Sequence, residues 1–221
     1  DSPAAAWGAA AARDPRWPAS LAVAVAVALT VTLPDPLVLY PRWILPAVEA
    51  VMVIPLTVAA PFRHHNEPSW VRLAGLVLIA VVEAANLASL TLLVNGILAG
   101  NAKATGHTLV VAAVQIYLTN IAVFALWFWE LDRGGPGARM RSDHRQPDFL
   151  FPQMMTPDSA PAGWTPGFVD YLYVAFTNAT AFSPTDTMPL TPTAKSLMSV
   201  ESLAALLTVA VVAARAINIL H

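Results

Sequence analysis

Side-chain oxygens are concentrated at one point of the chain, directly after a short apolar stretch that runs from about Phe168 to Phe182. The segment Thr180-Ala181-Phe182-Ser183-Pro184-Thr185-Asp186 offers the hydroxyl groups of Thr180, Ser183 and Thr185 and the carboxylate of Asp186. Oxygens of this kind can replace the water around an ion in a narrow constriction. The chemistry that the segment could support is therefore coordination of a monovalent ion.

A second set of polar residues lies inside long apolar segments: Glu49, Glu83, Asn86, Gln115, Asn120 and Glu201. Ionisable groups in such places are expensive and by default suggest function. Glu83 is near the middle of its segment, and Asn86 lies one turn away on the same helix face. Two interpretations stay open: a proton or cation relay, and interhelical hydrogen bonds between protonated or paired carboxyl groups and partners such as Gln115 or Asn120.

Other kinds of site find little support. The chain has no cysteine, which excludes disulfides and thiolate chemistry. No catalytic triad, phosphate loop or pair of catalytic carboxylates is evident, so we expect neither an enzyme nor a cofactor.

His64-His65 with Glu67 could bind a metal, but adjacent histidines in a surface loop more often do not, and we expect no metal site. Asn178-Ala179-Thr180 matches a glycosylation sequon within an apolar helix, where we expect no modification. A net charge of −2 without a basic run gives no nucleic-acid signal.

The composition indicates a protein of the lipid bilayer. The chain is 57% hydrophobic and 12% charged, whereas soluble domains carry about 25% charged residues. A membrane span needs roughly 20 apolar residues. The expected spans are about 20–33, 43–60, 71–98, 109–131 and 195–220. The sequence thus predicts an all-α polytopic membrane protein of about five transmembrane helices.

The expected domains follow from these spans. A disordered segment (1–17) precedes a three-helix membrane region (18–100). No span has Arg or Lys at three-residue spacing, so a voltage sensor of that type is not expected. The residue usage suits a bacterium, and we expect the bacterial cytoplasmic (inner) membrane.

The region after residue 131 differs in character. Residues 132–166 are rich in Gly, Pro, Arg and Asp and are expected to form a long solvated loop. Its mixed charges are Arg133, Arg139, Arg141 and Arg145 with Asp132, Asp143 and Asp148. The apolar stretch that follows is too short to span, and a short apolar helix beside a full span is typical of a re-entrant segment.

The segment from Val169 to Leu220 resembles the pore module of the potassium-channel superfamily, which has a short pore helix, a filter of the type Thr-Val-Gly-Tyr-Gly-Asp and an inner helix. Asp186, Pro189 and Thr191 match the family's post-filter Asp-x-x-Pro-x-Thr. Lys195 and Glu201 match a basic residue before the inner helix and an acidic residue early in it. The resemblance implies a pore-like module over 109–221: an outer helix (109–131), a loop (132–166), a pore helix and filter-like loop (168–191) and an inner helix (195–220).

The filter itself departs from the family pattern. The segment Ala181-Phe182-Ser183-Pro184-Thr185 stands in place of Thr-Val-Gly-Tyr-Gly. The two family glycines allow backbone angles that Ser183 and Thr185 adopt only with strain, and Pro184 fixes φ near −65°. We therefore expect altered or lost potassium selectivity.

The resemblance implies a homotetramer in the lipid bilayer, because a pore loop makes a pore only when subunits surround an axis. The expected function is an ion channel for monovalent ions. The alternatives are a small-solute or proton-coupled transporter that uses the re-entrant segment as a cradle, and a non-conducting scaffold. The channel resemblance places the filter end outside, whereas the positive-inside rule favours the opposite orientation.

Overall fold

The computed structural model of the chain describes residues 17–38, 69–98, 106–139, 145–156, 158, 160–161, 164–180 and 186–219. Several expectations lie outside these residues: the disordered start up to residue 16, the second span with Glu49, the histidine pair with Glu67, and the filter-like residues Ala181, Phe182, Ser183, Pro184 and Thr185.

Three helices in the described part of the chain are long and apolar enough to cross a membrane: α4 (Ser69–Leu98), α5 (Gly106–Leu131) and α9 (Pro192–Ile219). They confirm the helices expected over 71–98, 109–131 and 195–220. Helix α9 begins earlier than expected because Thr191 caps it, accepting a hydrogen bond from the Ala194 N–H, with Pro192 at the first helical position. The length and composition of the three helices indicate a membrane protein.

The first expected span corresponds to a shorter helix, α2 (Trp17–Val31). Its 15 residues fall below the roughly 20 that a span needs. The chain then makes a 3₁₀ turn, η1 (Asp35–Leu37), which starts at a proline pair that cannot continue an α-helix. Small residues on α2, such as Ala19 and Ala26, are buried, which lets its backbone approach its neighbours closely.

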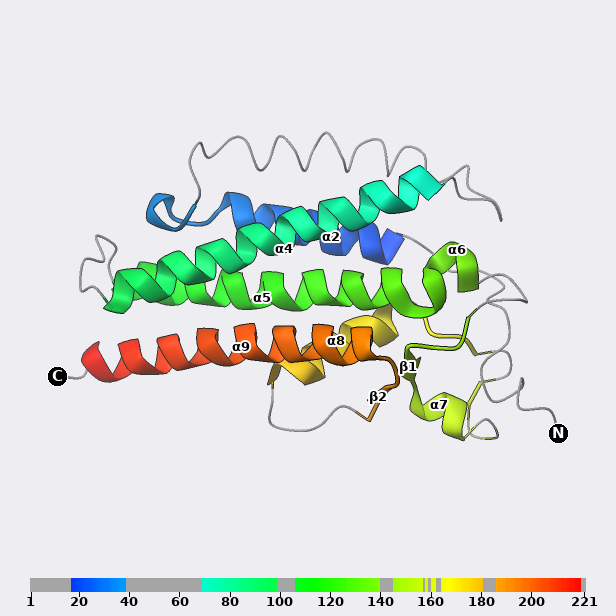
Figure 1. The fold of residues 1–221 in the computed structure, drawn as a ribbon. Coiled ribbons are helices and arrows are strands. Elements are labelled where there is room, and N and C mark those ends of the chain that lie inside the picture. Colours follow the sequence, from blue (N-terminus) through cyan, green and yellow to red (C-terminus); the bar gives the residue numbers. More distant parts are fainter. Residues whose placement is uncertain are drawn as a thin grey trace.

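Helix α5 is the centre of the bundle. It contacts α2, α4 and α9 and also the short helix α8 (Phe168–Thr180). Figure 1 shows α4, α5 and α9 running side by side along the long axis of the molecule. Most residues between Ile121 and Trp129 on α5 are buried, since neighbours surround that half of the helix.

Short elements gather at the end of the bundle where α5 finishes and α9 begins (Figure 1). They are η3 (Asp132–Gly134), α6 (Pro136–Arg139), β1 (Phe149–Leu150), α7 (Pro152–Met155) and β2 (Met188–Pro189). The two strands pair antiparallel, with Phe149 opposite Pro189 and Leu150 opposite Met188. This pairing ties the region after α5 to the residues just before α9.

The expectation of a solvated loop is wrong for three of its charged residues. Asp132, Arg133 and Arg139 are 0%, 1% and 1% exposed. The guanidinium of Arg139 folds back, donates to the carbonyl oxygens of Trp129 and Asp132, and lies over the rings of Trp129 and Tyr171. It therefore supplies side-chain donors to carbonyl groups at the end of the helix, where backbone donors become fewer.

Candidate functional site

The candidate site is built around α8, which lies between the two long helices α5 and α9 in the sequence and contacts both. The helix begins after Gly167, whose N–H donates to Oδ2 of Asp170 at 2.8 Å, so that the third helical residue caps the start of the helix. Tyr171, Val174 and Ala175 form its buried face. Its 13 residues give a length of about 20 Å, short of the roughly 30 Å thickness of the bilayer core.

The N-terminal part of α8 is fixed to the end of α5. The hydroxyl of Tyr171 donates to Oδ2 of Asp132 at 2.6 Å, and the other carboxylate oxygen of Asp132 accepts the N–H of Asp148 at 2.7 Å. Arg133 Nε lies 3.6 Å from Asp132 Oδ2, so the buried carboxylate has a cationic neighbour. A buried charge is tolerated only when it is paired and hydrogen-bonded, as it is here.

Asp148 joins the same end of the molecule to the start of α9. Its carboxylate accepts hydrogen bonds from the Arg133 N–H at 3.0 Å and from the Thr191 hydroxyl at 2.7 Å. Its carbonyl oxygen accepts the N–H of Leu190 at 2.8 Å. We call Asp132, Asp148, Tyr171 and Thr191 the anchor network, because it holds together the end of α5, the start of α8 and the start of α9.

The C-terminal part of α8 lies beside α9 instead. Asn178 Nδ2 donates to Oε2 of Glu201 at 2.6 Å and to the carbonyl oxygen of Met198 at 2.8 Å. Its Oδ1 accepts a hydrogen bond from the hydroxyl of Ser202 at 3.1 Å. Glu201 is nine residues after Pro192, which corresponds to about 13 Å along α9. Helix α8 thus runs from the anchor network toward the middle of the bundle.

Four of the polar residues predicted within the spans are buried in this middle region: Glu83, Asn86, Asn120 and Glu201. Asn120 Nδ2 donates to the carbonyl oxygen of Glu201 at 3.3 Å. The carboxyl groups of Glu83 and Glu201 are close enough to interact electrostatically. Gln115 lies elsewhere, because its Nε2 donates to the Thr32 hydroxyl at 2.8 Å.

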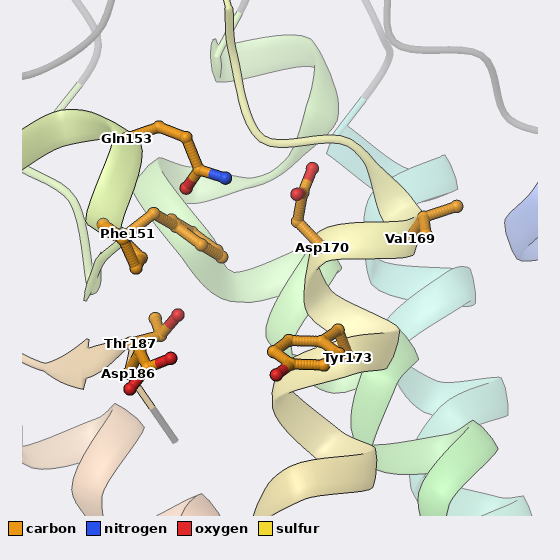
Figure 2. Close-up of a pocket in the computed structure, with 8 residues that line it drawn as sticks. Phe151, Gln153, Val169, Asp170, Tyr173, Asp186 and Thr187 are labelled. Atoms are coloured by element: carbon orange, nitrogen blue, oxygen red, sulfur yellow. The ribbon is translucent and has the colours of Figure 1, made fainter. Parts of the chain in front are cut away.

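Of the predicted oxygen-bearing segment, Thr180 and Asp186 are described. Thr180 ends α8, and its hydroxyl donates to the carbonyl oxygen of Thr177 at 2.9 Å. Asp186 is exposed and lines a hollow of about 380 Å³ between α7 and α8. Figure 2 shows Asp186 and Thr187 facing Phe151 and Tyr173 across this hollow.

Sequence reasoning missed the residues that fix α8 in place. The sequence marks Asn178 only as part of a sequon, although it follows Tyr171, Val174 and Ala175 at helical spacing and so shares their buried face. For Asp132 and Asp148 the sequence pattern indicates only charges of a loop. In the part of the chain that the structure describes, no group of three or more His, Asp or Glu residues is arranged to hold a metal.

Comparison of the chain with protein-family models, with curated proteins and with solved structures gives no match.

Proposed function

We propose that the chain is a subunit of a cation-conducting membrane protein of the pore-loop type. In this proposal α5 is the outer span, α9 is the inner span, and residues 168–191 form a re-entrant segment between them. In this proposal Thr180 and Asp186, at the two ends of the filter-like segment, line the ion path.

One observation carries the proposal: α8 enters the bundle and the chain returns to the end from which it started. Tyr171 is bonded to Asp132 at the end of α5, whereas Asn178 is bonded to Glu201 well inside α9. By Leu190 the chain is bonded to Asp148, at the first end again. A helix too short to span, followed by a return to the same side, is the expected course of a re-entrant segment.

The electrostatics of the α8 terminus favour a cation over an anion. A helix carries a partial negative charge of about −0.5 at its C-terminus, so the end of α8 at Thr180 attracts positive ions. The side chains bonded to this last turn, from Glu201 and Ser202, are acidic or neutral. Asp186 adds a carboxylate where the chain returns. Half-helix C-termini are used in this way to hold cations in other membrane proteins.

The proposal requires several copies of the chain around an axis, and we propose a homotetramer. Helix α9 is the least covered of the three long helices: 28% of its most apolar window is buried, against 67% for α5. Val200, Leu203 and Leu207 lie along one exposed side of α9 at helical spacing. Neighbouring subunits and lipid would cover this side.

The test is cation flux into liposomes that contain the purified protein. We expect the wild-type protein to pass K⁺ and Na⁺. We expect Asp186→Ala to lower the flux several-fold, because the variant removes the carboxylate from the proposed ion path. Asp158→Ala is the matched control, since Asp158 is also exposed but lies outside the re-entrant segment. Absence of flux in the wild type and both variants, with the oligomer intact by native mass spectrometry, would overturn the proposal.

A second candidate, a proton-coupled transporter, is favoured by the carboxyl groups of Glu83 and Glu201 in the middle of the bundle. A transporter would show saturable uptake of one solute that depends on a pH gradient. A channel would instead show flux that follows the electrochemical gradient of the ion.

A further inference from the structure

Glu83 and Glu201 are two buried carboxyl groups with unmet hydrogen-bonding capacity. Glu83 is 8% exposed near the middle of α4, and Glu201 is 0% exposed on α9. Neither oxygen of the Glu83 carboxyl has a hydrogen-bond partner, and Oε1 of Glu201 and Oδ1 of Asn120 also have none among the described residues. All four atoms are acceptors when the carboxyl groups are ionised, so this region lacks donors.

No positive charge in the described residues compensates these carboxyl groups. The buried Arg133 and Arg139 are held at the anchor network, and Arg72 donates to the carbonyl oxygen of Glu130. The groups that face Glu201 are Glu83 from α4, Tyr117 and Asn120 from α5, and Asn178 from α8. Helix α2 has no titratable side chain. Among the described residues no side chain donates to these four atoms, and a proton or a small cation would supply the missing donor.

A proton fits this arrangement best. Glu83 and Glu201 lie on α4 and α9, which contact each other, and two like charges brought together in an apolar region disfavour each other, so we expect the pair to hold at least one proton. Protonation also converts one carboxyl oxygen from an acceptor into a donor, which supplies the missing hydrogen bond. A single charged group in mid-membrane costs at least ~2.5–3.5 kcal/mol, and a proton removes that cost.

We propose that Glu83 and Glu201 form a proton-binding site in the middle of the bundle, and that this site holds the end of α8 through Asn178. The link is direct, because Asn178 Nδ2 donates to the Glu201 carboxyl two residues before α8 ends. A change in the charge of Glu201 acts on that hydrogen bond first. This proposal does not depend on the proposed channel function.

The test is labelling with dicyclohexylcarbodiimide, a lipid-soluble reagent that modifies protonated carboxyl groups in apolar surroundings, on the wild-type protein in liposomes. Peptide mass mapping identifies the modified residue. We expect modification at Glu83 or Glu201, falling about tenfold for each pH unit above the pKa of the site. Exposed Asp186 is the internal control and should stay unmodified. The labelling does not require flux, so a failure here and a failure of the channel proposal are distinguishable.

Two outcomes would overturn the proposal. Protection by Na⁺ or K⁺ at constant pH would show that a metal cation, not a proton, occupies the site. Absence of label at both residues, together with no infrared carbonyl band of a protonated carboxyl that disappears in Glu83→Gln or Glu201→Gln, would show that neither group is protonated. Because the infrared and labelling measurements both include the wild type, a variant that fails to fold leaves the proposal testable.

Discussion

Asn178 on α8 and Glu201 on α9 are joined by a hydrogen bond of 2.6 Å between Nδ2 and Oε2. This bond connects the last turn of a short helix to the buried interior of a long one, far from the anchor network that holds the other end of α8. The two attachments together set the direction of α8. The position of Thr180, and hence the start of the filter-like segment, depends on both.

Asn178→Ala should lower the stability of the protein by about 1–2 kcal/mol. The variant removes the hydrogen bonds to Glu201, Met198 and Ser202, and interhelical hydrogen bonds within membranes average ~0.6 kcal/mol each. Thr177→Ala is the matched control, because the hydrogen bonds that the Thr177 hydroxyl donates go to carbonyl groups of α8 itself. Thermal unfolding in detergent measures both variants. Equal losses in the two would mean that the link to α9 is not the important contact.

A second prediction concerns the anchor network at high pH. Burial raises the pKa of the Tyr171 phenol well above its ordinary value; the nearby Arg139 guanidinium opposes this shift, and the Asp132 carboxylate adds to it. The folded protein therefore prefers the protonated phenol. The free energy of unfolding contains the full contribution of this phenol below a pH of about 10, which is the pKa of tyrosine in the unfolded chain. The contribution is lost as the pH rises above that value.

Tyr171→Phe tests this prediction, since it removes the hydroxyl and keeps the ring. We expect the variant to be about 1–3 kcal/mol less stable at neutral pH, because Asp132 loses a buried donor, and to lose less further stability above pH ~10. Tyr173→Phe is the control on the same helix, as Tyr173 is 57% exposed. The measurement is the unfolding midpoint as a function of pH. Parallel pH profiles for wild type and Tyr171→Phe would contradict the assignment.

The turn after α5 gives a third prediction. Gly135 has φ of +99°, and a Cβ there would lie 2.9 Å from the carbonyl oxygen of Glu130. Gly135→Ala should therefore cost roughly 1–3 kcal/mol, through both backbone strain and this close contact. Gly75→Ala should instead raise the stability. Gly75 lies in α4, where Ala is the better helix former, and a Cβ there would meet nothing within 4 Å among the described residues. Thermal unfolding should separate the two variants in opposite directions.

The fold was predictable where one apolar stretch forms one element. The stretches over 71–98, 109–131 and 195–220 correspond to α4, α5 and α9, and the short stretch after Phe168 corresponds to α8. Their signal is local, because length and apolar composition are sufficient to indicate a helix that can cross a membrane. The polar residues Glu83 and Glu201 were found in the same way, as exceptions within apolar runs.

The anchor network was not predictable on those grounds. Asp132 bonds to Asp148 and Tyr171, which are 16 and 39 residues away along the chain, and Thr191 bonds to Asp148 across 43 residues. Alternating charges in a Gly- and Pro-rich segment are typical of a solvated loop, and only the tertiary fold reveals that these groups satisfy one another. Buried polar partners of this kind leave no periodic signal in the sequence.

The last prediction concerns assembly. Leu203 is 58% exposed on the least covered long helix, and Trp70 is 65% exposed on α4. Because the sequence contains no cysteine, Leu203→Cys and Trp70→Cys each place a single spin label in an otherwise natural chain. In a fourfold ring the labels occupy the corners of a square, so each variant should give two distances in a ratio of about 1.4.

Pulsed dipolar spectroscopy in lipid nanodiscs measures these distances. If α9 lines the inner side of the ring, the two distances at Leu203 should both be shorter than those at Trp70, while the ratio stays the same. The control for crowding is dilution of labelled oligomers with unlabelled oligomers. Dilution should remove the signal between labels in different oligomers. A single distance would indicate a dimer or a trimer and no distance a monomer, and each of these results would contradict the fourfold ring.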